Sequence, residues 1–385
     1  MGVAATRFLR FDGLRALAAL SIVAYHQATQ AGAFDSGALK QLAGRLDIGV
    51  PVFFVISGFL LYRPFVAADV EGRGAPDTGA YAWRRFLRIA PAYWVALVLV
   101  ALINPIHDIL ARDGLKYFSF TQIYAPGGSG GIPQAWTLCI EVTFYAFLPL
   151  LAWVVRRLGR GRDALRNHWL AVAAVGLGGA LFTIVNVLVS DQDRAFANPW
   201  LVALPNWLDT FAPGMALAVL SVAVARRGDE PGASRGRLAP WVWAGAAAVF
   251  ALAAFGLGLS GTPGETKSDA QYLALHFAYA VFGGLFVLPA VFGTGRDLVG
   301  RVLSWRPLVF CGVISYGIYL WHPTAFELAD RAGLAKLGLL FTIGIAWLSW
   351  QLVERPALSL KRLIPGRPAP TAVPPAITPL APEQA

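Results

Sequence analysis

The chain has 385 residues, of which 57% are hydrophobic and only 14% are charged, with a formal net charge of +10. Soluble domains carry about 25% charged residues, so this composition favours a membrane protein. The basic residues lie in short clusters between apolar runs, as in membrane proteins, and aromatic–basic interleaving on a soluble face is absent, which excludes nucleic acid as a partner.

Many apolar runs reach the roughly 20 residues that span a bilayer, and such runs predict helices because a backbone in lipid must satisfy its own hydrogen bonds. The sequence predicts an all-α, polytopic membrane protein of about ten transmembrane helices, without a second soluble domain. The predicted spans are 12–29, 47–67, 89–106, 135–155, 168–189, 205–225, 239–259, 272–294, 308–328 and 335–354. Cys139 and Cys311 lie inside these spans without metal-ligand spacing, so neither a metal site nor a disulfide is expected.

The Lys and Arg residues are distributed unequally between the two sides of these spans. With a cytoplasmic N-terminus, 22 of them fall on the inner side and eight on the outer side, while Arg15 and Arg63 lie within spans. Lys and Arg accumulate in cytoplasmic loops, so both termini are predicted to be cytoplasmic. We expect residues 1–362 to form the transmembrane domain and the Pro- and Ala-rich residues 363–385 to form a disordered cytoplasmic tail.

The first predicted helix carries Asp12, Arg15 and His26. Basic residues before it and small residues at 31–33 would also fit a signal peptide, but a disposable segment does not need these ionisable side chains, so we expect a retained helix. Arg15 and His26 are eleven residues apart, close to three helical turns, and therefore share one face about 16 Å apart. Ionisable residues in a span are functional-site candidates. For His26 a functional role is favoured over a buried structural histidine, whereas Asp12 and Arg15 fit a structural ion pair equally well.

A second basic cluster, Arg84, Arg85 and Arg88, precedes the third predicted helix. Arg85 and Arg88 are three residues apart, so they share a face if the segment is helical. Guanidinium groups suit phosphate binding. Anchoring to lipid headgroups is the alternative, and spacing alone favours that alternative. The segment 107–134 that follows this helix is predicted to be a long outer loop containing a short interfacial or re-entrant piece.

The fourth predicted helix places Glu141 a few residues from its outer end, flanked by Trp136 and Tyr145, and the ninth places His322 near its outer end. Counted at about 1.5 Å per residue, His26, Glu141 and His322 all fall in the outer half of the membrane. A carboxylate that holds an imidazole in one tautomer makes a general base near neutral pH, so these residues predict a catalytic site. Structural roles are expected for Asp209, His276, Glu327 and Glu354.

Five segments resemble, in order, the motifs of membrane-bound acyltransferase family 3, whose transmembrane enzymes acylate sugars, peptidoglycan, lipopolysaccharide and some antibiotics. They are residues 11–26, 49–60, 85–91, 135–145 and 315–323, spread over nearly the whole membrane domain. The resemblance implies that His26 is the catalytic histidine, Arg15 an essential arginine and Glu141 its acidic partner. It also implies that Arg85 and Arg88 bind the phosphates of acyl-CoA, whereas His322 matches a position whose role in the family is less settled.

This sequence departs from the family pattern in two ways. Thr137 stands where the family usually has serine, which retains the hydroxyl group, so little consequence is expected. The soluble esterase-like domain that some members carry at the C-terminus is not found in the sequence. The chain is therefore expected either to complete the transfer within its membrane domain or to pass the acyl group to a separate protein.

The sequence thus predicts a multi-pass plasma-membrane O-acyltransferase that moves an acyl group, expected to be acetyl, from cytoplasmic acyl-CoA to a hydroxyl group. Acyl-CoA is a co-substrate, and no permanently bound cofactor is expected. The acceptor is an envelope sugar, a lipid-linked glycan or a secreted glycoside. The expected donor site comprises Arg84, Arg85, Arg88 and Arg15. The expected general base is His26, held by Glu141. Further residues expected near the substrate are His322, Trp136, Tyr145 and Asp12. The alternative is a transporter or proton-coupled exporter, which would use the same intramembrane residues but would more often show internal repeats, and none is found.

Overall fold

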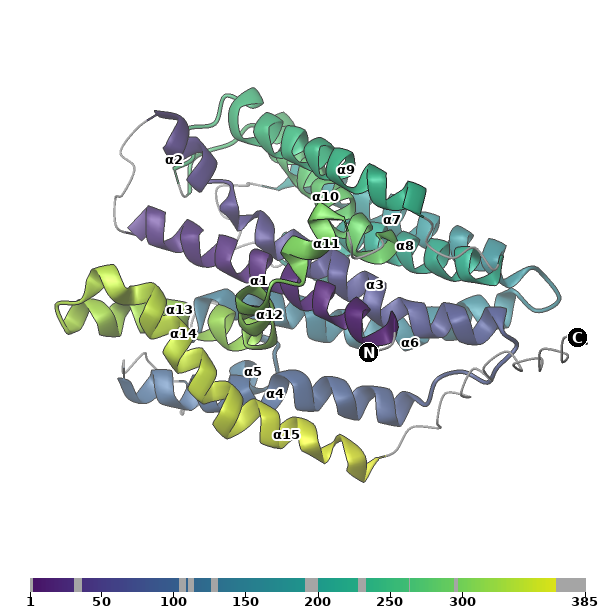
Figure 1. Cartoon of the computed structure of the whole chain (residues 1–385), viewed down its shortest axis with the longest axis horizontal. Coiled ribbons are helices and arrows are strands. Elements are labelled where there is room, and N and C mark those ends of the chain that lie inside the picture. Colours follow the sequence, from purple (N-terminus) through teal and green to yellow (C-terminus); the bar gives the residue numbers. More distant parts are fainter. Residues whose placement is uncertain are drawn as a thin grey trace, which may run out of the picture.

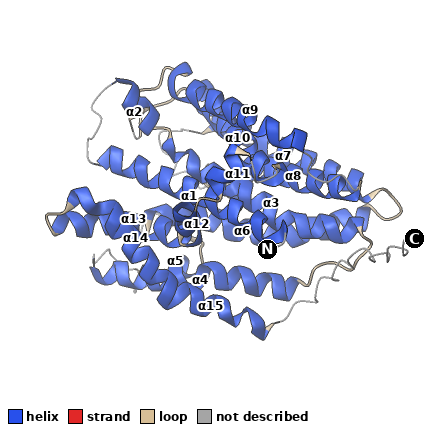
Figure 2. Cartoon of the chain, viewed as in Figure 1, coloured by secondary structure: helices blue, strands red, loops and turns tan. Residues whose placement is uncertain are grey.

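The computed structural model describes residues 3–30, 37–103, 109, 114–125, 131–190, 200–227, 233–262, 264–293 and 297–364. All regular elements in these ranges are helical (Figure 2). The α-helices are α1 (Val3–Gln30), α2 (Gly37–Ala43), α3 (Gly49–Val70), α4 (Thr78–Ile103), α5 (Gly114–Phe118), α6 (Trp136–Leu158), α7 (Ala164–Val189), α8 (Leu208–Arg226), α9 (Ala233–Ala251), α10 (Asp269–Phe292), α11 (Leu298–Leu303), α12 (Arg306–Val313), α13 (Ser315–Arg331), α14 (Gly338–Ser349) and α15 (Arg355–Ser359). The positions 31–33 and 365–385, on which the expected processing site and most of the expected tail fall, lie outside the described residues.

Within the described ranges, eight helical segments are long and apolar enough to cross a membrane. They contain α3, α4, α6, α7, α8, α9, α10 and α14, which correspond to eight of the ten predicted spans. The predicted spans 12–29 and 308–328 are not among these eight. The first corresponds to α1, which carries charged residues, and the second to α12 and α13, of which the longer has only 17 residues. A multi-pass, all-helical membrane protein is therefore confirmed, while the total of ten spans stays a prediction.

The helices are arranged as a bundle with α3 at its centre (Figure 1). Helix α3 packs against α1, α6, α7, α8 and α10. Its closest crossing is with α8, where a Cβ atom on Gly58 would lie 2.4 Å from the carbonyl oxygen of Phe211, and one on Gly214 would lie 1.9 Å from that of Val55. Small residues at such crossings let transmembrane helices approach backbone to backbone. This contact fixes the position of Ser57, which precedes Gly58 in the chain.

The connections alternate between the two ends of the bundle. The turns after α3 and α6 lie at the right of Figure 1, whereas α2 and the turn between α13 and α14 lie at the left. This arrangement matches the alternation that the charge distribution predicts. The assignment of the arginine-rich end to the cytoplasm stays a prediction.

One connection at the α2 end of the bundle is held by a hydrogen-bonded carboxylate. Arg45 donates to Oε1 of Glu265 over 2.5 Å, and the backbone N–H and the hydroxyl of Ser260 both donate to Oε2 over 2.6 Å. Burial raises the pKa of the Glu265 carboxyl group, but these hydrogen bonds outweigh burial and leave the pKa lowered overall. The ionised carboxylate therefore ties the segment before α3 to the loop before α10.

The segment before α6 enters the bundle. Helix α5 and the 3₁₀ turns Gln122–Tyr124 and Pro133–Ala135 bury Tyr117, Phe120 and Ile123 in the main apolar core. Non-helical backbone is tolerated at membrane depth where it is buried in protein. This segment thus covers the start of α6 within the protein, while the short interfacial or re-entrant piece expected in 107–134 stays a prediction.

Candidate active site

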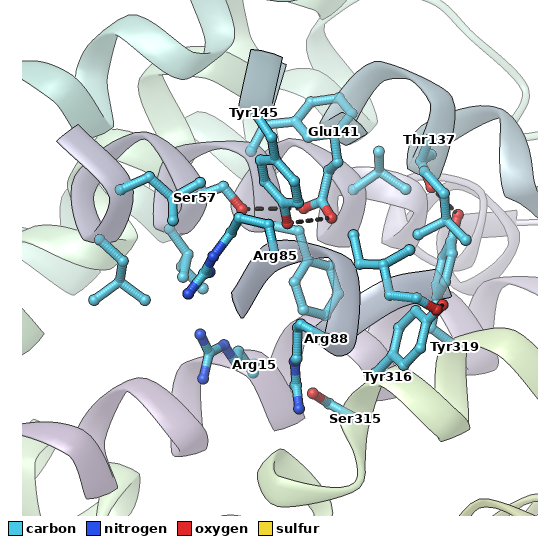
Figure 3. Close-up of a pocket in the computed structure, with 18 residues that line it drawn as sticks. Arg15, Ser57, Arg85, Arg88, Thr137, Glu141, Tyr145, Ser315, Tyr316 and Tyr319 are labelled. Atoms are coloured by element: carbon cyan, nitrogen blue, oxygen red, sulfur yellow. Dashed lines mark hydrogen bonds between the residues drawn. The ribbon is translucent and has the colours of Figure 1, made fainter. Parts of the chain in front are cut away.

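Five helices, α1, α3, α4, α6 and α13, converge on one cavity of about 100 Å³, which has room for several water molecules or a small ligand group. Its polar side chains are drawn in Figure 3. They are Arg15, Ser57, Arg85, Arg88, Thr137, Glu141, Tyr145, Ser315, Tyr316 and Tyr319. We call this cavity the arginine pocket.

Three guanidinium groups give the arginine pocket its charge. Arg85 and Arg88 come from one face of α4, as their spacing predicts, and Arg15 comes from α1 (Figure 3). Arg15 donates to Asp12 over 3.2 Å. Arg85 and Arg88 lie near aromatic rings, with their guanidinium carbons 5.9 and 6.0 Å from the ring centroids of Tyr145 and Tyr316.

Glu141 is the only carboxyl group among the described residues that line the arginine pocket. With three cations and one carboxylate, the pocket has an excess of positive charge, which suits an anionic ligand such as phosphate. Arg84, which was expected to join this site, is exposed on α4 and does not line the pocket. Its predicted role in donor binding stays a prediction without a contact to support it.

The carboxylate of Glu141 is held in place by two hydroxyl groups. Ser57 of α3 donates to Oε1 over 3.0 Å, and Tyr145, one turn further along α6, donates to Oε2 over 3.2 Å (Figure 3). The tight α3–α8 crossing positions Ser57 for this bond. Hydrogen bonds to both oxygens fix the orientation of the carboxyl group in the arginine pocket.

His26 and His322 form a second group beside the arginine pocket. Their ring centroids are 4.9 Å apart, and the side chain of His322 is fully buried. Nδ1 of His322 lies 2.8 Å from the backbone carbonyl oxygen of Tyr319. A carbonyl oxygen can only accept, so Nδ1 carries the hydrogen, and Nε2 of the neutral ring keeps its lone pair. This Nε2 is buried without a hydrogen-bond partner among the described residues.

Tyr319 connects the two groups. Its hydroxyl group lines the arginine pocket and bonds to the hydroxyl of Thr137 over 2.7 Å and to the carbonyl oxygen of Gln134 over 2.8 Å. Its backbone carbonyl holds His322, and its ring centroid lies 6.1 Å from that of His322. Tyr319 therefore contacts both the arginine pocket and His322.

The structure brings together some of the predicted site residues and separates others. Arg15, Arg85, Arg88, Glu141 and Tyr145 share the arginine pocket, with Asp12 bonded to Arg15. His26 pairs with His322, eleven residues along α1 from Arg15. Trp136 packs on Trp207 with ring centroids 5.5 Å apart and does not line the pocket. The expected contact between Glu141 and His26 stays a prediction.

Several lining residues were not singled out from the sequence. Ser57 and Tyr316 lie within segments that carry the family resemblance, but only the fold shows that Ser57 reaches Glu141. Tyr319 could have been suspected from its place three residues before His322 on a helix. Among the described residues, no group of three or more His, Cys, Asp and Glu side chains could hold a metal ion.

Two further histidines form buried pairs with aspartate outside the arginine pocket. Nε2 of His276 lies 2.9 Å from Oδ2 of Asp209. Nε2 of His168 lies 3.0 Å from Oδ2 of Asp69, and its Nδ1 lies 2.7 Å from the hydroxyl of Tyr62. These pairs join helices that are distant in sequence. The geometry is in keeping with the structural role expected for Asp209 and His276.

Known proteins are similar to this chain over nearly all of its membrane domain. Residues 8–351 match the profile of the acyltransferase domain of acyltransferase family 3. The chain is similar to peptidoglycan O-acetyltransferase OatA of Listeria monocytogenes, with 26% identity over 90% of this chain and 55% of that protein. It is also similar to nodulation protein 10 of Rhizobium leguminosarum bv. viciae, with 25% identity over 83% of this chain and 84% of that protein.

The match to the family profile includes every residue of the arginine pocket and the histidine pair. No solved structure matches the chain. The chain spans about half the length of OatA. Because the family profile covers nearly the whole chain, this multi-pass membrane protein belongs to acyltransferase family 3, as its sequence motifs predict.

Proposed function

We propose that the protein transfers an acyl group, in the first place acetyl, from cytoplasmic acyl-CoA to a hydroxyl group of a sugar at the outer side of the membrane. The observation that carries this proposal is that Tyr319 of α13 lines the arginine pocket and holds, through its backbone carbonyl, the buried His322, which pairs with the partly buried His26. The arginine pocket suits a polyanionic donor, and the histidine pair supplies a base. The family match supports acyl transfer as the reaction class.

In the proposed donor site, the phosphates of acyl-CoA lie on Arg85, Arg88 and Arg15. Guanidinium groups bind phosphate through parallel, charge-assisted hydrogen bonds. In this proposal the narrow pantetheine arm, and not the adenosine, enters the bundle. The arm leads the thioester past Tyr319 toward the histidine pair.

In the proposed reaction, the acceptor hydroxyl gives its proton to His26 while its oxygen attacks the thioester carbonyl carbon. The carbon–sulfur bond then breaks, and the CoA thiolate leaves and takes up a proton from the imidazolium. His322 stands 4.9 Å from His26, ring to ring, with its Nε2 lone pair buried, and is placed to share that proton. Glu141 serves at the donor end, where it orients Tyr145 and balances the arginines.

A sugar of the cell envelope is the acceptor class that we favour, because OatA is named as a peptidoglycan O-acetyltransferase. A lipid-linked glycan and a secreted glycoside are the other acceptors to be tested. A transporter would also need intramembrane His, Glu and Arg residues, but the family match favours transfer chemistry.

The test uses the full chain in lipid nanodiscs with isotope-labelled acetyl-CoA and a panel of envelope glycans and glycosides, with product detection by mass spectrometry. We expect acetylated product and CoA release from the wild type. Loss of a general base typically costs a factor of about 10² to 10⁴, so H26A should lose nearly all transfer while remaining inserted in the membrane. H322N should lose less. Uptake of a solute into vesicles without acetyl transfer would refute the proposal, and wild-type turnover by H26A would remove His26 from it.

A further inference from the structure

Glu354 is a buried carboxyl group that the reaction proposed above does not use. Its side chain is 2% exposed, and neither carboxylate oxygen has a hydrogen-bond partner among the described residues. Taking a carboxylate out of water without hydrogen bonds is costly, so such a group requires a compensating interaction.

The compensating interaction is with Arg88. Oε2 of Glu354 lies 3.9 Å from Nη1 of Arg88, which is too long for a hydrogen bond but close enough for strong attraction between charges away from water. The carboxyl group is carried by a π-helical turn, Trp350–Glu354, between α14 and α15, and this turn packs against α4. π-Helical turns are rare and occur frequently at functional sites.

Arg88 also faces the arginine pocket, where it stands with Arg15 and Arg85. It therefore lies between a buried carboxylate and the space that would receive the donor's phosphates. Its guanidinium group has five N–H donors and can contact both anions, but the two negative charges repel each other across it. Glu354 and a bound phosphate therefore weaken each other's net attraction to Arg88.

We propose that Glu354 is an internal counter-ion, which neutralises Arg88 while the arginine pocket is empty and yields it to a phosphate of the donor. This proposal rests on the donor site proposed above. Glu354 touches no substrate and is a positioning residue. Its charge moderates the affinity for CoA, so that CoA can leave after the acyl group has been transferred.

The variant E354Q tests the proposal because it keeps the size of the side chain and removes its charge. The Kd of CoA is measured with the full chain in nanodiscs. The pair is partly exposed on the arginine side, which places it between surface pairs and fully buried ones, so we expect E354Q to bind CoA roughly tenfold more tightly. The CoA dissociation rate should fall accordingly.

Three controls separate this effect from a change in packing. E327Q removes an exposed carboxylate from α13 and should leave the Kd of CoA unchanged. S-acetylpantetheine has no phosphate, so its binding should be the same in E354Q and the wild type. In an R88Q background, E354Q should have no further effect on the Kd of CoA, because the two residues act through each other.

A folded E354Q that binds CoA with the wild-type affinity or more weakly would overturn the proposal. Should E354Q fail to insert, E354D keeps the charge on a shorter stem, further from Arg88, and is expected to bind CoA a few times more tightly than the wild type. A wild-type Kd for E354D would then overturn it. A wild-type chain that does not bind CoA would refute the donor site itself, so the two failures are distinguishable.

Discussion

Replacing Arg85 by alanine, with the neighbouring R84A as control, tests the donor site most directly. Both residues are arginines on α4 in the same basic cluster, but Arg85 lines the arginine pocket and Arg84 is exposed outside it. The Nε atom of Arg85 is buried without a hydrogen-bond partner among the described residues, so part of its hydrogen-bonding capacity is unused. A generic lipid anchor would not distinguish the two positions.

The size of the effect follows from these environments. A hydrogen bond to a charged group contributes about 1.5–3 kcal/mol, which corresponds to a loss of affinity of roughly 10- to 150-fold for R85A. An exposed charge contributes about 0–1 kcal/mol, so R84A should lose less than about fivefold. The KM for acetyl-CoA should rise in R85A, while kcat should change much less because the histidine pair is untouched.

The assay is equilibrium binding of CoA to each variant in nanodiscs, followed by steady-state transfer, at two salt concentrations. Phosphate binding by arginine weakens as salt rises, so the difference between R85A and R84A should be largest at low ionic strength. Equal losses in R84A and R85A would refute the reasoning, because the two residues would then act as general basic anchors.

Three further predictions concern other parts of the molecule. E141Q removes a negative charge from the arginine pocket and keeps a side chain of the same size, so the KM for acyl-CoA should fall, whereas kcat should change much less because the histidine pair is untouched; a raised KM measured by steady-state kinetics would contradict this role. H168L should lower the free energy of unfolding by about 1–3 kcal/mol, because it removes the partner of the buried Tyr62 hydroxyl and one of the two partners of Asp69, which keeps Arg156, whereas turnover per folded molecule should stay the same. E265Q should lower the Tm at pH 7. Because the pKa of Glu265 is lowered in the folded state, its stabilisation is present above the unfolded pKa of about 4.3 and is lost as the pH falls through the folded value. The Tm difference between E265Q and the wild type should therefore narrow below about pH 4, and a constant difference in thermal-shift measurements would exclude this origin.

Much of the fold could be predicted from the sequence, because a span in lipid is encoded locally by its apolar residues. The span predicted at 168–189 corresponds to α7, Ala164–Val189. The span predicted at 308–328 is instead interrupted between α12 and α13. Near this break, a Cβ atom on Gly312 would lie 1.9 Å from the carbonyl oxygen of Asp12, so the chain packs against α1 at a point that no local pattern marks.

The shared face of Arg85 and Arg88 was also predictable, since it needed only helical spacing. The partner of Glu141 on α3 was not, because only the packing of α3 against α6 brings Ser57 to its carboxyl group. The depth of Glu141 in the membrane, counted along α6, stays a prediction. Glu141 lies in the arginine pocket, hydrogen-bonded to Ser57 and Tyr145.

Helix α1 runs without interruption from Val3 to Gln30, and it carries Arg15 at the arginine pocket and His26 at the histidine pair. A continuous α-helix holds two positions eleven residues apart at about 16 Å along its axis. With the roles proposed for these residues, this helix sets the distance between the phosphate site and the catalytic imidazole, and so the length that the arm of the donor must have. A thioester attached close to its anionic group would fall short of the imidazoles, so donor selection would depend on the length of the arm as well as on the acyl group.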